Sequence, residues 1–191
     1  MKYYILFGPP GAGKGTQAGA IAEKFNLKHV STGELLRAEI AAGTELGRQA
    51  KTLIEAGNLV PDSVVEGMIE NLFNTLKGVD GFLLDGFPRT LGQAEDLDKM
   101  LSARGEKVDA VISLMISDST IRGRLKGRAA IEGRADDANE ETISNRIATY
   151  HQKTEPLINF YKAAGKYHEL NGDGKSIEQV RALVFDLLNT L

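Results

Sequence analysis

The sequence of 191 residues contains no cysteine and no tryptophan. The absence of cysteine excludes disulfide bonds and cysteine-bound zinc, and it fits a reducing compartment. No apolar stretch approaches the ~20 residues that a membrane helix requires. Aromatic residues make up only 6% of the chain and the net charge is −3, which argues against a basic, ring-stacking surface for nucleic acid. We therefore expect a cytoplasmic protein without membrane or nucleic-acid partners.

The composition that remains is that of a folded domain. Hydrophobic residues make up 42% of the chain and charged residues 26%, which is ordinary for a globular protein with a buried core. The length predicts one compact α/β domain with room for small inserted lobes.

A glycine-rich segment near the N-terminus is the most informative motif. The apolar run 3–7 predicts a buried strand, and apolar residues at helical spacing over 14–25 predict a helix. Between them lies Gly8-Pro9-Pro10-Gly11-Ala12-Gly13-Lys14-Gly15-Thr16. This order predicts a phosphate-binding loop, in which main-chain N–H groups and a helix N-terminus surround the phosphate oxygens and Lys14 adds a full charge. A glycine-rich loop of a different nucleotide fold is the alternative.

The loop departs from the general pattern in one position that concerns the metal. Gly15 stands where a serine or threonine hydroxyl ordinarily ligates Mg²⁺, and Thr16 follows it. We therefore expect Mg²⁺ to be held by phosphate oxygens and water, without a direct protein ligand. Asp85 ends the apolar run 81–84 and is expected at the carboxyl edge of a central parallel strand, where it would hold the ion through water. Capping of the following turn is its alternative role.

The rest of the chain alternates strands with helices. Further strands are expected at 29–31, 81–85, 108–116 and 167–170, and helices at 33–42, 45–56, 61–76, 91–103, from 118 onward, 140–164 with a kink at Pro156, and 176–188. This alternation predicts a P-loop three-layer sandwich, with a five-stranded parallel sheet and helices on both faces. The two helices within 31–60 have little apolar surface and predict a small mobile lobe, with an ordinary surface helix pair as the alternative.

Basic residues gather in one segment of this acidic chain, at Arg122, Arg124, Lys126, Arg128 and Arg134. Arg124 and Arg128 are four residues apart and share a helix face, and their planar guanidinium groups suit phosphate. Arg122 and Lys126 are expected on the solvated face. Asp136 and Asp137 are expected either to orient the arginines or to cap the next helix.

Three residues outside this segment also bear on function. Arg37 and Arg89 exceed what one triphosphate needs, so they indicate a second phosphate-bearing ligand. His151 is expected to be packed or exposed rather than catalytic, because no acid, serine or cysteine stands at a recognised spacing from it.

The motifs together resemble the adenylate kinase family. The resemblance covers essentially the whole chain and rests on residues 8–17, Ser31-Thr32-Gly33-Glu34-Leu35-Leu36-Arg37, Asp85-Gly86-Phe87-Pro88-Arg89-Thr90, Gly133-Arg134-Ala135-Asp136-Asp137 and Tyr150-His151. It implies a single nucleoside-monophosphate kinase domain. The core comprises 1–30, 61–126 and 138–191, the monophosphate-binding lobe 31–60 and the lid 127–137. Long-lid members insert a longer segment after Arg128, so the resemblance is to the short-lid form and implies no bound zinc.

The resemblance also assigns the site residues. The ATP-binding residues it implies are Gly11, Ala12, Gly13, Lys14, Gly15, Thr16, Arg128 and Gly174. The AMP-binding residues it implies are Thr32, Arg37, Asn58, Leu59, Val60, Gly86, Phe87, Pro88, Arg89, Gln93, Arg134 and Arg146. The catalytic residues it implies are Lys14, Arg89, Arg124, Arg134 and Arg146.

The implied reaction is reversible phosphoryl transfer from MgATP to AMP, giving two ADP, by a monomer that maintains the balance of adenine nucleotides. The acceptor oxygen is already anionic at neutral pH, so catalysis needs positioning and positive charge rather than a general base. Water must be excluded, so the lobe and the lid are expected to close before transfer.

Two other functions stay open. A UMP/CMP kinase of the same fold is the first, and Thr32 argues against it because pyrimidine kinases tend to have alanine at that position. A nucleotide-dependent switch without turnover is the second, although neither the Asp-x-x-Gly nor the Asn-Lys-x-Asp motif of GTPases occurs.

Overall fold

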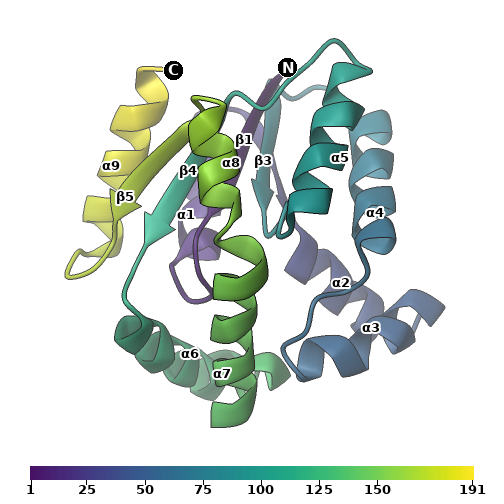
Figure 1. Ribbon diagram of the computed structural model, residues 1–191, viewed down its shortest axis with the longest axis vertical. Coiled ribbons are helices and arrows are strands. Elements are labelled where there is room, and N and C mark those ends of the chain that lie inside the picture. The colour runs from purple at the N-terminus through teal and green to yellow at the C-terminus, as the bar shows by residue number, and fades with distance from the viewer.

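A computed structural model describes all 191 residues and contains one five-stranded sheet in the order β2-β3-β1-β4-β5. The strands are β1 Lys2–Phe7, β2 Leu27–Ser31, β3 Gly81–Asp85, β4 Ala110–Met115 and β5 Tyr167–Asn171. Every neighbouring pair is parallel. The predicted α/β fold is therefore confirmed, and the glycine-rich loop follows the central strand (Figure 1).

Helices cover both faces of the sheet. One face packs against α4 (Asp62–Thr75), α5 (Leu91–Ser102) and α8 (Leu157–Ala163), and the other against α1 (Lys14–Lys24) and α9 (Ile177–Asn189). Successive residues of a strand point to opposite faces, so Tyr3 and Ile5 of β1 belong to one core and Tyr4 and Leu6 to the other. None of the helices is both long enough and apolar enough to span a membrane.

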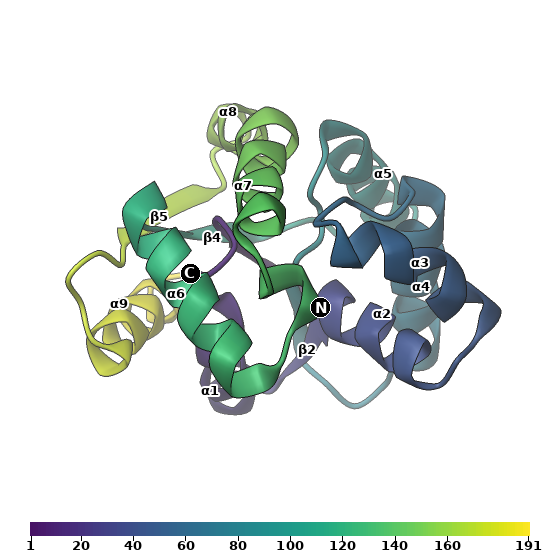
Figure 2. The same cartoon turned by 90° about the horizontal axis from the view of Figure 1, so that it is seen from below.

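Two groups of helices extend beyond the carboxyl ends of the strands. The first comprises α2 (Thr32–Ala41) and α3 (Glu45–Glu55). The second comprises α6 (Asp118–Glu132), a 3-10 turn at Ala135–Asp137 and α7 (Glu140–Thr149). Figure 2, which views the molecule from this end, shows α6 and α7 on one side and α2 and α3 on the other. Their side-chain caps explain where these helices start, since Ser31, Thr44, Ser117 and Asn139 each accept a hydrogen bond from a first-turn N–H group.

The helix expected over 140–164, with a kink at Pro156, is divided into three pieces in the structure. The α-helix ends at Thr149, a π-helical turn occupies Tyr150–Thr154, and α8 starts at Leu157. Pro156 has no N–H group to continue a helical hydrogen-bond ladder, and the wider turn is closed by the N–H of Glu155, which donates to the carbonyl of Tyr150 at 2.8 Å. The irregular turn thus comes before the proline, and the backbone of Glu155 and Pro156 keeps helical angles.

Candidate active site

A cleft of about 820 Å³ opens where the sheet presents the carboxyl ends of its strands. Its lining combines the loop after β1 with the starts of α1 and α2, the segment that follows α3, the turn after β3, parts of α6 and α7, and the loop after β5. The two groups of helices that face each other in Figure 2 form its walls. Ligands of open parallel sheets bind at this edge.

The predicted order of strand, glycine-rich loop and helix is present, because β1 ends at Phe7 and α1 begins at Lys14. Gly8 has a φ of 141°, and a Cβ atom there would lie 2.3 Å from the carbonyl oxygen of Leu114. Gly13 has a φ of 92° immediately before the helix. Such backbone angles strain any residue with a side chain, so both positions require glycine for the loop to turn tightly over the strand end.

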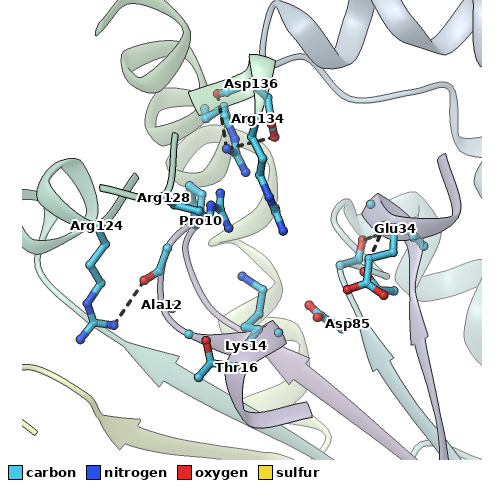
Figure 3. A pocket seen from close by; sticks show the side chains of 18 of the residues that line it. Pro10, Ala12, Lys14, Thr16, Glu34, Asp85, Arg124, Arg128, Arg134 and Asp136 are labelled. Carbon is cyan, nitrogen blue, oxygen red and sulfur yellow. Dashed lines mark hydrogen bonds and ion pairs between the residues drawn. The ribbon is translucent and has the colours of Figure 1, made fainter. Parts of the chain in front are cut away.

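Lys14 lies at the floor of the cleft, facing Asp85 (Figure 3). Its Nζ donates hydrogen bonds to the carbonyl oxygens of Gly8 at 2.9 Å and Pro9 at 3.0 Å. Burial lowers the pKa of Lys14 to about 8, with nearby arginines acting in the same direction and Asp85 opposing them. At neutral pH the ammonium group therefore still carries its charge, and it is poorly solvated.

Asp85 ends β3 and is 8% exposed. Burial alone would raise its pKa, but a hydrogen bond from His29 and the charge of Lys14 outweigh burial and hold the pKa below its usual value. His29 Nε2 lies 3.3 Å from Asp85 Oδ2. The sequence reasoning missed this partner, whose only signal was a histidine two residues before the end of a strand.

The donor set fits the metal that the loop sequence implies. No group of three or more histidine, cysteine, aspartate or glutamate side chains is arranged to hold an ion, whereas Asp85 is an ionised carboxylate beside the phosphate loop. Mg²⁺ keeps several waters and commonly uses one carboxylate together with substrate phosphates. These residues therefore suit a magnesium ion brought in with its nucleotide.

Asp136 and Asp137, which follow α6, position arginines of the wall that α6 and α7 form. Arg128 Nε lies 2.5 Å from Asp137 Oδ2 and its second nitrogen 3.0 Å from Oδ1. Arg146 of α7 contacts Asp136 Oδ2 at 3.1 Å and also bonds to Asp137. Because Asn139 caps α7 instead, orientation of the arginines is the one of the two expected roles that the structure confirms.

The other basic residues of α6 and its end divide as expected. Arg124 lines the cleft and donates to the carbonyl oxygen of Gly11 at 3.3 Å. Arg134 also lines it and pairs with Glu132 at 2.6 Å. Figure 3 shows Arg128 and Arg134 both pointing toward Lys14. Arg122 and Lys126 lie outside the cleft lining and pair with Glu140, so their prediction as a solvated face is confirmed.

The opposite wall presents a second set of basic and polar groups. Arg89 donates from Nε to the carbonyl oxygen of Gly86 at 2.7 Å, and the Thr32 hydroxyl donates to the same oxygen at 3.0 Å. Burial lowers the pKa of Arg89 and of Arg37, and neighbouring arginines lower them further. Asn58, Leu59, Val60 and Gln93 complete this wall.

Three predicted site residues lie outside the cleft lining. Phe87 is 1% exposed because its ring belongs to the core between the sheet and α4 and α5. Pro88 lines a smaller pocket behind Arg89. Gly174 is exposed at a turn with a φ of 69°, while Gly172 and Lys175 on either side line the cleft. No motif marked those two positions, because they depend on how the loop after β5 folds.

His151 is exposed and lies away from the cleft, as expected. The expectation that no acid pairs with it is wrong. Its Nε2 lies 3.0 Å from Asp118 Oδ1, and its Nδ1 bonds to Glu155. Glu155 stands four residues after the histidine, a spacing at which helical side chains meet, whereas Asp118 is distant in sequence and its contact depends on the tertiary fold.

Known proteins resemble the chain over most of its length. The family model described as adenylate kinase matches residues 6–166. An adenylate kinase of Leptospira biflexa is 50% identical over 94% of this chain and 96% of its own. Adenylate kinases of Phocaeicola vulgatus and of a Nocardioides species are 47% and 46% identical, covering 91% and 98% of this chain and 92% and 97% of their own.

Proposed function

The chain belongs to the adenylate kinase family, and we propose that it transfers a phosphoryl group reversibly from MgATP to AMP to give two ADP. The observation that carries the proposal is the pair of basic walls in one cleft, with Lys14 at the floor between them. One nucleotide's phosphates would engage only one wall. Two nucleotides that meet above Lys14 would engage both.

The donor nucleotide occupies the phosphate loop. The N–H groups of residues 11–16 and the N-terminus of α1 surround its phosphates, and Lys14 neutralises the group in transfer. Arg128 and the loop that includes Gly172 and Lys175 border its base. Asp85 would hold Mg²⁺ through water, and the ion would supply positive charge that offsets the charge of the phosphates.

The acceptor nucleotide occupies the opposite wall, within the lobe 31–60 and beside β3. Arg37 and Arg89 bind its phosphate, and Thr32, Gln93 and the segment 58–60 border its base. The Thr32 hydroxyl supports AMP over a pyrimidine acceptor, because a site with a placed polar group penalises the base that leaves it unpaired.

The transfer itself needs charge rather than proton chemistry. Arg124, Arg134 and Arg146 line the cleft and stabilise the oxygens of the migrating group, which spreads negative charge over three atoms. Asp136 and Asp137 hold the guanidinium groups of Arg146 and Arg128 in advance, which lowers the reorganisation needed at transfer. Closure of the lobe 31–60 and the lid 127–137 over the core excludes water.

We also propose that the protein acts as a monomer in the cytoplasm, with small nucleotides as its partners. The lack of cysteine supports a reducing compartment. Size-exclusion chromatography with light scattering measures the oligomeric state.

The deciding experiment is a coupled assay of ADP formed from MgATP, with AMP, CMP, UMP and GMP offered in parallel. The variant Lys14→Ala, purified the same way, measures any contaminating host kinase. Activity with AMP that disappears in the variant supports the proposal. Activity with CMP or UMP alone would favour a pyrimidine kinase, and nucleotide binding without any turnover would favour a switch.

A further inference from the structure

The side-chain amide of Gln93 is bonded at both ends. Its Oε1 accepts a hydrogen bond from the main-chain N–H of Arg89 at 2.7 Å, and its Nε2 donates to Asp62 Oδ1 at 2.7 Å. A main-chain N–H can only donate and a carboxylate can only accept. The two bonds therefore fix which end of the amide is oxygen and which is nitrogen.

The amide keeps bonding capacity of its own, and Gln93 lines the cleft. Of its two N–H groups and two lone pairs, one of each remains after these bonds. Adenine presents an amino donor beside a ring-nitrogen acceptor, which complements an amide of fixed orientation. Hypoxanthine presents the reverse pattern, a carbonyl acceptor beside a ring N–H donor, and an amide held in this way cannot match it.

Asp62 supplies the bond that comes from another helix. It is the first residue of α4, where the helix dipole favours a negative charge. Its second oxygen lies 3.3 Å from the Thr90 hydroxyl, which in turn accepts from the N–H of Gln93 at 3.2 Å and caps α5. One carboxylate thus ties the start of α4 to both the cap and the amide of α5.

We propose that Asp62 is a specificity-determining positioning residue, which keeps the Gln93 amide in the orientation that accepts adenine and rejects bases of the opposite pattern. The inference rests on the proposed function and deepens its acceptor site. Without Asp62 only the N–H of Arg89 orients the amide, and rotation about its last bond becomes easier.

The test compares AMP with IMP as acceptors by measuring kcat/KM for each. In Asp62→Ala the ratio of AMP to IMP is expected to fall about tenfold, which is the loss of roughly one hydrogen bond's discrimination. The rescue variant Asp62→Asn is expected to stay within about threefold of the original ratio, because its carbonyl still accepts from Gln93. Thermal melting of each variant reports the structural contribution separately, and Asp62→Ser replaces the alanine variant if that one does not fold.

The variant Gln93→Ala shows whether Asp62 acts through the amide. Adding Asp62→Ala to Gln93→Ala is expected to leave the AMP to IMP ratio unchanged within about twofold, since coupled residues are not additive. An Asp62→Ala enzyme that melts earlier but keeps the original ratio would overturn the inference. The inference would also be overturned if Asp62→Ala lowered the AMP to IMP ratio as much in the Gln93→Ala background as in the unmodified protein. If the unmodified protein does not phosphorylate AMP at all, the proposed function fails instead.

Discussion

The folded protein holds the charge of Lys14 at a cost, and this cost predicts a pH dependence of stability. Burial lowers its pKa from 10.5 in the unfolded chain to about 8 in the folded one. Between these values the unfolded chain binds one more proton than the folded chain, so the free energy of unfolding rises with pH. Below pH 8 both forms hold the proton and the full cost is present.

The magnitude follows from the two pKa values. They differ by about 2.5 pH units, and each unit corresponds to about 1.4 kcal/mol, so the Lys14 contribution to the free energy of unfolding should rise by about 3 kcal/mol between pH 8 and pH 10.5. The variant Lys14→Met has no such group and lacks this rise.

The assay is urea unfolding of the wild type and the variant at several pH values across this range, followed by circular dichroism because the chain has no tryptophan. The quantity of interest is the difference in the free energy of unfolding between the two proteins. This difference cancels the contributions of other titrating groups such as Tyr3, whose pKa burial raises to about 12. Lys28→Met, at an exposed position, is the matched control and should show no pH-dependent difference. A wild-type-minus-variant difference that stays flat up to pH 10.5 would refute the buried-charge argument.

Three further predictions concern other parts of the molecule. Arg134→Ala should lower turnover at least about a hundredfold. It should not affect folding, because the ion-pair partner of Arg134 is an exposed glutamate. Arg122→Ala, outside the cleft, should keep near-normal turnover and serves as the control in the same assay. Gly57→Ala should lower stability by about 3 kcal/mol or more, since the residue has a φ of 77° and its new Cβ would lie 2.7 Å from an arginine side chain of α7. Gly43→Ala has a similar φ but open space, and should lose only about 1 to 2 kcal/mol by urea unfolding. Hydrogen bonds that His151 donates to Glu155 and Asp118 raise the pKa of the histidine, so it stabilises the fold below its unfolded pKa, and this contribution is lost as the pH rises through the folded one. The stability difference between wild type and His151→Gln should be larger at low pH, and equal differences at both ends of the range would contradict it.

The sequence predicted the features that depend on neighbours along the chain. The helices α2, α3 and α5 begin and end within about one residue of their expected bounds, because caps and glycine stops are local signals. The π-helical turn that precedes α8 was not predictable from neighbours along the chain. This turn begins at Tyr150, whose ring packs against the ring of Phe7 in the central strand, with 6.1 Å between the ring centroids. That contact depends on the tertiary fold.

The candidate site shows the same division. Lys14 and the glycines of its loop were assigned from one continuous segment. The partners that tune the site are distant in sequence, as with His29 and Asp85 or Asp62 and Gln93. Such pairs follow from which strand or helix lies beside which, and a single sequence carries no signal for that. The failure of Gly174 to reach the cleft has the same origin, since the loop after β5 has no motif to fix its path.

The distribution of charge links these observations to function. The chain is acidic overall, yet Lys14, Arg37, Arg89 and Arg146 converge on one cleft, and burial followed by mutual repulsion lowers the pKa of each. A fold selected only for stability would not bring so many half-buried like charges together, because each costs desolvation and raises the cost of the next. Bound phosphate groups offset both the desolvation and the repulsion of these side chains, because they replace the lost hydration and pair with the charges. The unfavourable energy of these charges should therefore contribute to nucleotide affinity. Mutations that remove one of the charges should stabilise the protein while weakening its binding of phosphates.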